Sequence, residues 1–242
     1  MRKLPQEYLD DILVRLAHHS SALEGNTITL SETISIILHN QVLSNRGIDM
    51  RELYEIKNHE QAFQYLIQEL EQDAPLHVQT IKEIHALLMD RLQYDRGQFK
   101  SEDNAILGAD FMTASVQETP FLMQQWVDNL TYRLDAATTA QAKLMSIAEA
   151  HIAFERIHPF ADGNGRTGRM ILNYSLLQHD FAPLIIHSKE KATYLRFLAE
   201  QDAVGFSRFI EAALTEEQQR LQRFVNKERQ QIAPSSLNQD ID

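Results

Sequence analysis

The chain has 242 residues, 43% of them hydrophobic and 24% charged, which is enough apolar material for a sizeable core. Its formal net charge of -11 argues against broad binding to nucleic acid or anionic membranes, so any anion site must be concentrated. The absence of cysteine excludes disulfides, thiolate catalysis and cysteine zinc sites. Because no signal-peptide core or membrane-length apolar run is present, we expect a cytoplasmic protein.

Helical patterns fill most of the chain, so we predict an all-α fold. Apolar residues recur at helical spacing in segments that begin near residues 12, 53, 81, 121 and 144. Two capping boxes and one N-cap before proline mark predicted helix starts; they are Thr29 with Glu32, Asp49 with Glu52, and Thr119 before Pro120.

Two predicted helices enclose a polar, glycine-rich loop. The helix from about 141 to 157 is apolar nearly all round and should be central, and Pro159 biases His158 away from helical geometry. A second helix restarts near Gly165. The loop between them is therefore expected to be held against the core.

Residues 93–118 are the long exception to the helical pattern, and a short β-hairpin is the best interpretation. A non-helical segment of this length inside a compact domain is often functional. Beyond about residue 215 the sequence turns glutamine-rich and charged, which predicts a frayed tail. We expect one globular unit made of an N-terminal helical segment (1–45), a core (46–215) and this helical or frayed tail (216–242).

The loop's residues are typical of an anion site. Gly163 and Gly165 permit positive φ and close approach of backbone N–H groups to a phosphate, with Asn164 between them, and the following helix adds its unpaired N–H groups. Arg166 and Arg169 lie one helical turn apart, so both can lean toward the same anion.

Two further residues of the loop suggest chemistry. Asp162 is its only carboxylate, and one carboxylate with substrate phosphates is a common way to hold Mg²⁺. His158 suits proton acceptance near neutral pH. A glycine-rich turn or a histidine before proline is usually only structural, but a structural turn needs no arginines, acid and histidine together.

The segment His158-Pro159-Phe160-x-Asp162-Gly163-Asn164-Gly165-Arg166-x-x-Arg169 resembles the full signature of the Fic family, and the similarity extends over roughly residues 15–200. The resemblance implies an all-helical core with a small β-hairpin flap. It also implies a protein adenylyltransferase, which transfers AMP from ATP to a Tyr, Thr or Ser hydroxyl of a target protein.

The resemblance assigns roles within the loop. His158 would deprotonate the target hydroxyl, and Asp162 would hold Mg²⁺ or Mn²⁺ between the α- and β-phosphates. The remaining loop residues would bind the nucleotide phosphates; they are Gly163, Asn164, Gly165, Arg166 and Arg169. The flap would pair its main chain with the target polypeptide; its central residues are Asn104, Ala105, Ile106, Leu107 and Gly108.

Ser20 and Glu24 share one face of the first predicted helix, which Gly25 closes. A glutamate at a helix C-terminus is mildly unfavourable, although a solvated side chain would be an ordinary explanation. The pattern resembles the Fic inhibitory motif placed N-terminal to the core. By that resemblance Glu24 pairs with Arg169 and occupies the place of the ATP γ-phosphate.

Three alternatives to inhibited AMP transfer stay open. In some relatives the same glutamate orients a water that removes AMP from the target, and others use another phosphate donor. A nucleotide-binding regulatory module without turnover is the alternative of another class, although it would need no base at His158. The expected partners are ATP and an unidentified target protein, with a homodimer as a family expectation, and neither nucleic acid nor membrane.

Overall fold

A computed structural model describes residues 4–43, 47–106 and 111–232 of the chain. This part of the chain folds into α-helices and one 3-10 turn without any strand, which confirms the predicted helical class. The helices are α1 (Gln6–Leu23), α2 (Leu30–Leu38), α3 (Met50–Glu71), α4 (Val78–Leu88), α5 (Thr119–Ala136), α6 (Ala140–Ile157), α7 (Asn164–Gln178), α8 (Lys191–Glu200) and α9 (Ala203–Ile232), and the 3-10 turn is η1 (Ser188–Glu190).

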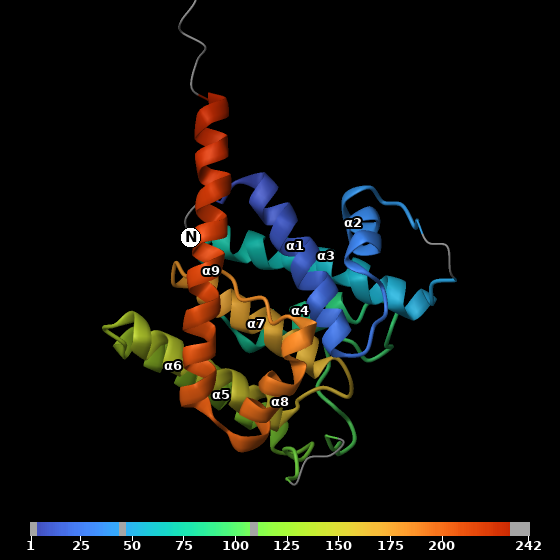
Figure 1. The fold of residues 1–242 in the computed structure, drawn as a ribbon. Coiled ribbons are helices and arrows are strands. Elements are labelled where there is room, and N and C mark those ends of the chain that lie inside the picture. The colour runs from blue at the N-terminus through green and yellow to red at the C-terminus, as the bar shows by residue number, and fades with distance from the viewer. Residues whose placement is uncertain (1–3, 44–46, 107–110, 233–242) are drawn as a thin grey trace, which may run out of the picture.

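Helix α7 lies at the centre of the bundle. Among its residues only Gly165 and Gln178 are not buried, so it presents no polar face to solvent. It packs against α6, α4, α3 and α1, and α6 packs in turn against α5 and α9 (Figure 1). The N-terminus of α7 is therefore fixed from several sides, as an anion site at a helix end requires.

The predicted helix starts are right within a residue but differ in detail. The capping box of Thr29 and Glu32 forms at the start of α2, which confirms it. Asp49 caps α3 through the N–H of Arg51, whereas the predicted partner Glu52 accepts instead from the N–H of Thr27 at 2.5 Å. Helix α5 has Glu118 as its N-cap, so Thr119 is already its first residue.

The predicted hairpin over 93–118 is wrong for residues 93–106 and 111–118, which form turns, bends and irregular chain. Backbone and side-chain groups of this segment bond to the loop after α6 in place of a cross-strand partner. The backbone N–H of Lys100 donates to the carbonyl of Pro159 at 2.9 Å, and the side-chain amide of Asn104 donates to the carbonyl of Phe160 at 2.8 Å. Two isolated strands would be only marginally stable, which favours this alternative. Leu107 and Gly108 lie outside the described residues.

Helix α9 continues well past residue 215 and extends beyond the rest of the bundle at its C-terminal end (Figure 1). Its apolar residues Leu214 and Leu221 are buried. The carboxylate of Glu217 accepts from the hydroxyl of Tyr8 at 2.8 Å and from Arg15 at 2.7 and 2.8 Å. These bonds fasten α1 to α9. No helix in the described ranges is long and apolar enough to cross a membrane.

Candidate active site

The loop between α6 and α7 begins with a reversal of the chain at His158, which adopts a left-handed conformation with φ of 51° and caps α6. Two residues later, Phe160 is fully buried and its ring stacks on His85, with centroids 3.7 Å apart. His85 itself interacts with the carbonyl of Asp162 at 3.0 Å. The aromatic anchor therefore holds the loop against α4.

His158 has a defined tautomer. Its Nδ1 lies 3.2 Å from the carbonyl oxygen of Glu155. Because a carbonyl can only accept, Nδ1 must carry the proton, which leaves the lone pair on Nε2 free to act as a base. Burial lowers the pKa of His158 below its ordinary value and nearby Lys100 lowers it further, although the bond to Glu155 opposes both. The neutral imidazole is therefore favoured at neutral pH.

The glycine and asparagine of the predicted anion nest have distinct positions. Gly163 has φ of 75° and is the N-cap of α7, so the backbone N–H groups after it are directed out of the helix end. The side chain of Asn164 is buried and spans the loop, accepting from the N–H of Phe160 at 2.9 Å and donating to its carbonyl at 2.8 Å. Asn164 thus contributes to the nest through its backbone, while its side chain holds the loop closed.

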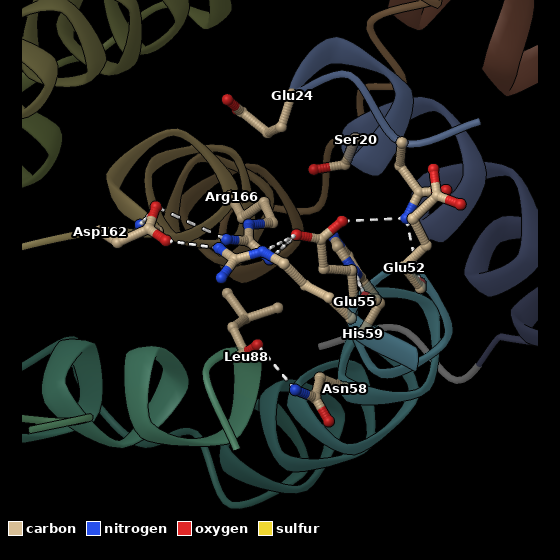
Figure 2. A network of polar contacts seen from close by, with 12 residues as sticks. Ser20, Glu24, Glu52, Glu55, Asn58, His59, Leu88, Asp162 and Arg166 are labelled. Carbon is tan, nitrogen blue, oxygen red and sulfur yellow. Dashed lines mark hydrogen bonds and ion pairs between the residues drawn. The ribbon is translucent and has the colours of Figure 1, made fainter. Parts of the chain in front are cut away.

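Arg166 is buried between two carboxylates. Its guanidinium lies 3.4 Å from Glu55 of α3 and 3.8 Å from Asp162, and Figure 2 shows these residues on either side of it. Nε and Nη1 of Arg166 have no hydrogen-bond partner in the part of the chain that the structure describes, although Nη1 is the atom in ion-pair contact with Glu55. A buried guanidinium with unused donors is suited to a doubly charged anion such as a phosphate.

Asp162 lies at the exposed rim of the loop. One carboxylate oxygen accepts from the N–H of Gly163 at 2.6 Å, and the other lies 2.7 Å from Nη2 of Arg51. Burial alone would raise the pKa of Asp162, but the charge of Arg166 and the bonds from Gly163 and Arg51 lower it. The carboxylate is therefore ionised and forms an ion pair with the guanidinium of Arg51.

Sequence reasoning missed Arg51 and Glu55. They are one turn apart on α3, with Nε of Arg51 3.3 Å from Oε1 of Glu55. Their spacing alone indicates an ordinary pair on a helix surface. Only the packing of α3 against α7 reveals that both reach the loop.

Arg169 joins the loop to the end of α1. Its Nε donates to the hydroxyl of Ser20 at 3.0 Å, and its Nη2 donates to the carbonyl of Ser20 at 2.9 Å and to Glu24 at 2.6 Å. Burial would raise the pKa of Glu24, but the charge and hydrogen bond of Arg169 lower it, and the charges of Arg166 and Lys191 lower it to a smaller extent. The predicted contact of Glu24 with Arg169 is therefore present.

A cavity of about 640 Å³ opens beside these residues, a volume suited to a nucleotide-sized ligand. His158, Arg169, Glu24 and Gly165 line its polar end. Its apolar wall comes from α8 and from the predicted flap; the residues are Tyr194, Leu195, Leu198, Ala199, Ile106 and Phe111. Of the predicted flap residues, Ile106 therefore reaches the cavity, and Asn104 bonds to the loop beside it.

Glu155 is a buried carboxyl group on the cavity wall that sequence reasoning did not single out. Its Oε1 has no hydrogen-bond partner among residues 4–43, 47–106 and 111–232, and it lies 3.9 Å from Nε2 of His151. That nitrogen contacts the hydroxyl of Tyr194 at 2.8 Å. Burial raises the pKa of Glu155 to about 7. His151 is itself buried in the core.

Comparisons with known proteins agree with this geometry. Residues 75–176 match the model of the Fic/DOC family. The chain is 31% identical over 199 residues to the "Protein adenylyltransferase Fic" of Drosophila willistoni, and the match covers 80% of this chain and 38% of that protein. The chain thus spans less than two fifths of this curated relative.

Solved structures share the fold. A Fic domain containing signaling protein from Bacteroides thetaiotaomicron superposes with a TM-score of 0.82 at 25% identity, over 93% of this chain and 94% of that one. A Fic family protein from Desulfovibrio desulfuricans gives 0.72 at 26% identity, over 93% of this chain and 67% of that one. Since the matched segment contains the complete loop from His158 to Arg169 and the fold agrees along nearly the whole chain, the protein belongs to the Fic/DOC family.

Proposed function

We propose that this protein is a protein adenylyltransferase, which transfers AMP from ATP to a hydroxyl side chain of a target protein. The observation that carries the proposal is the free Nε2 of His158, which is fixed by the carbonyl of Glu155 beside a cavity that ends in Arg169 and the N-terminus of α7. A base is thus placed next to an anion site. The adenylyltransferase named among the relatives supports the same chemistry.

In the proposed reaction, Nε2 of His158 accepts the proton of the target hydroxyl as its oxygen attacks the α-phosphorus of ATP. A new oxygen–phosphorus bond forms, the bond between the α-phosphorus and the bridging oxygen breaks, and pyrophosphate leaves with the electron pair. The N–H groups after Gly163 and the unused donors of Arg166 would bind the phosphates. Catalysis would come mainly from positioning and charge stabilisation.

Asp162 fits the role of a ligand for Mg²⁺ or Mn²⁺. It is an ionised and half-exposed carboxylate at the phosphate end of the loop, and it already attracts the cationic group of Arg51. A single carboxylate completed by substrate phosphates and water is a usual arrangement for Mg²⁺. When bound, the metal would neutralise charge on the phosphates and on the leaving pyrophosphate.

We further propose that Glu24 inhibits the enzyme. Its carboxylate binds Arg169 and lies against Gly165, where a Cβ atom would come within 2.5 Å of Oε1. An anion is therefore already at the N-terminal turn of α7, where a phosphate would bind. With Arg169 engaged by Ser20 and Glu24, the terminal phosphate of ATP would lack its partner and the α-phosphate would be misaligned.

The test is transfer of label from ATP labelled at the α-phosphate to proteins of a cell lysate in the presence of magnesium. We expect Glu24→Gly to raise labelling at least tenfold over wild type, because it frees Arg169, and His158→Ala in that background to abolish it. Glu200→Gly is the matched control, since Glu200 also lines the cavity but makes no ion pair with Arg169 among the described residues. Equal labelling by wild type and Glu24→Gly would refute the inhibitory role.

The other functions are distinguished by intact mass of the incubated Glu24→Gly protein and its modified targets. An added AMP supports the proposal, and a different added mass identifies another donor. Loss of AMP from a pre-modified target, dependent on Glu24, would establish removal of AMP. Binding of ATP without any modification would identify a regulatory module and overturn the proposal.

A further inference from the structure

The Asp162 carboxylate is already paired with a positively charged side chain, that of Arg51. Nη2 of Arg51, in the first turn of α3, lies 2.7 Å from Oδ2 of Asp162, although the two residues are 111 positions apart in sequence. Asp162 and Glu55 lie on either side of Arg166 (Figure 2), and Arg51 lies within ion-pair distance of both carboxylates. The guanidinium therefore occupies the oxygen that a metal ion would need.

Arg51 has a second acidic partner within reach. Its Nε lies 3.3 Å from Oε1 of Glu55, so one guanidinium spans two carboxylates. Arg51 has more room to move than Glu55, because the side chain of Arg51 is 53% exposed and that of Glu55 only 10%. Asn26 holds Glu55 by donating to its Oε2 at 2.9 Å. Arg51 can therefore leave Asp162 and keep a counterion, while Glu55 stays in place.

We propose that Arg51 is a positioning residue that occupies Asp162 in the metal-free protein and moves onto Glu55 when a divalent cation binds. The inference rests on the proposed role of Asp162 as metal ligand. Mg²⁺ needs an oxygen at about 2.0–2.1 Å and dehydrates reluctantly. A guanidinium on the same oxygen would compete with it both sterically and by charge, so Arg51 lowers the metal affinity of the site.

Pairing with Arg51 also affects the loop itself, because it balances the charge of Asp162 before a metal ion binds. Asp162 is the only carboxylate of the loop, and its side chain is 48% exposed. Arg51 balances its charge and keeps it oriented, with Oδ1 bound to the N–H of Gly163. The loop is then held in one geometry before nucleotide and metal arrive.

The test is a titration of the protein with Mn²⁺ at saturating ADP, in which free Mn²⁺ is measured by electron paramagnetic resonance. We expect Arg51→Met to bind Mn²⁺ about three- to fivefold more tightly than wild type, the upper part of the range expected for loss of one exposed ion pair. Asp162→Asn should lose this binding. Arg91→Met is the control, because it removes the same charge from a side chain that contacts Tyr54 of α3 and not Asp162.

Each outcome separates the two proposals. If no variant binds Mn²⁺ in a way that depends on Asp162, the metal role fails. If Asp162-dependent binding exists but Arg51→Met binds equally or more weakly, the inference about Arg51 alone is overturned. ADP affinity without metal is measured as well, since a weaker affinity in Arg51→Met would make Arg51 a phosphate ligand instead. Arg51→Gln, checked by thermal melting, replaces the methionine variant if that one does not fold.

Discussion

Two glycines of the loop helix are explained by carboxylates that lie against them. A Cβ atom at Gly165 would come within 2.5 Å of Oε1 of Glu24, and one at Gly168 would collide with Oε1 of Glu155. The chain therefore has no side chain where α1 and α6 place their acidic groups. At the scale of single residues, Gly165 and Gly168 are helical and matter for the space they leave. The positive φ that the sequence allowed at both Gly163 and Gly165 occurs only at Gly163.

The pH dependence of transfer follows from His158. Because burial lowers its pKa below the ordinary value of about 6.5, the imidazole stays neutral and able to accept a proton as the pH falls to that value. We expect kcat/KM of the Glu24→Gly enzyme to be flat from pH 8 to about 6.5 and to decline only below it. Removing Glu24 also removes a charge that raises the pKa of His158, so the direction is reinforced.

A decline centred above pH 6.5 would contradict this account of His158. The profile is measured at saturating magnesium, with thermal melting at each pH to exclude unfolding. Lys100→Met is an informative companion, because Lys100 lowers the pKa of His158 and its loss should move the acidic limb to higher pH.

At the scale of elements, α1 carries Glu24 and is held by its partners at both ends. Its last turn bonds to α7 through Ser20 and Arg169, and its earlier turns bond to α9 through Tyr8, Arg15 and Glu217. Burial raises the pKa of Tyr8, and the charge of Glu217 raises it further, so the phenol stays a hydrogen-bond donor. Glu24, the residue proposed to inhibit transfer, is thus placed at the end of a helix that is fastened to two other helices.

The bond set at Glu217 should contribute strongly to stability. Glu217→Ala leaves the hydroxyl of the fully buried Tyr8 without its acceptor and removes one of the two carboxylates that Arg15 binds, the other being Asp11. We expect the free energy of unfolding, measured with urea, to fall by about 2 kcal/mol, because a buried hydroxyl loses its partner while Arg15 keeps one counterion.

The matched control lies on the same helix interface. Glu7 of α1 pairs with Lys227 of α9 at 2.6 Å, but both side chains are more than half exposed. Glu7→Ala should therefore change the free energy of unfolding by no more than about 0.5 kcal/mol. Equal losses of unfolding free energy for the two variants would show that the hydrogen bonds of Glu217 with Tyr8 and Arg15 stabilise the fold no more than the exposed pair does.

At the scale of the whole molecule, the net charge of -11 is locally balanced around the loop. Arg51, Arg166 and Arg169 are each within ion-pair distance of at least one of Glu24, Glu55 and Asp162. The guanidinium groups of Arg51 and Arg169 are hydrogen-bonded to carboxylates, whereas Nε and Nη1 of Arg166 have no hydrogen-bond partner among the described residues. The donors left for the proposed phosphate site are therefore concentrated at Arg166 and at the N-terminus of α7.

Glu155 makes global stability depend on pH. Burial raises its pKa to about 7 in the folded protein, while the unfolded chain has the ordinary value of about 4.3. The folded state thus binds more protons between these values, so the contribution of Glu155 to stability falls as pH rises from about 4.5 to 7 and stays lost above it. Glu155→Gln should abolish this dependence.

The free energy of unfolding of Glu155→Gln minus that of wild type should increase by about 2 to 3 kcal/mol from pH 4.5 to pH 8. The measurement is urea unfolding of both proteins at both pH values. His151, Tyr194, Arg169 and Glu24 surround the group, and of these Arg169 opposes the shift and Glu24 adds to it. A difference between the two proteins that does not change with pH would show that Glu155 is ionised in the folded state throughout.

The sequence alone predicts the helices because their signals are local. Apolar spacing, the capping box at Thr29 and the proline after His158 each act over a few residues, and the structure follows them. The hairpin failed because residues 93–118 combine turn-forming and apolar residues, which do not specify a partner. Lys100 and Asn104 of this segment instead donate hydrogen bonds to backbone carbonyl groups of the loop after α6. Of the helical or frayed tail predicted after residue 215, the residues up to Ile232 are helical, and Glu217 within them bonds to Tyr8 and Arg15 of α1.

For the site, the sequence by itself determined the loop from His158 to Arg169 and the spacing of Ser20 and Glu24, since fixed offsets within one turn or one helix are readable without a fold. Only the tertiary structure decided which groups meet. The tautomer of His158, the pairing of Arg51 with Asp162, the burial of Glu155 and the contact of Glu24 with Arg169 arise from helix packing. Such contacts join residues up to 145 positions apart, and their energies depend on burial that no local pattern specifies.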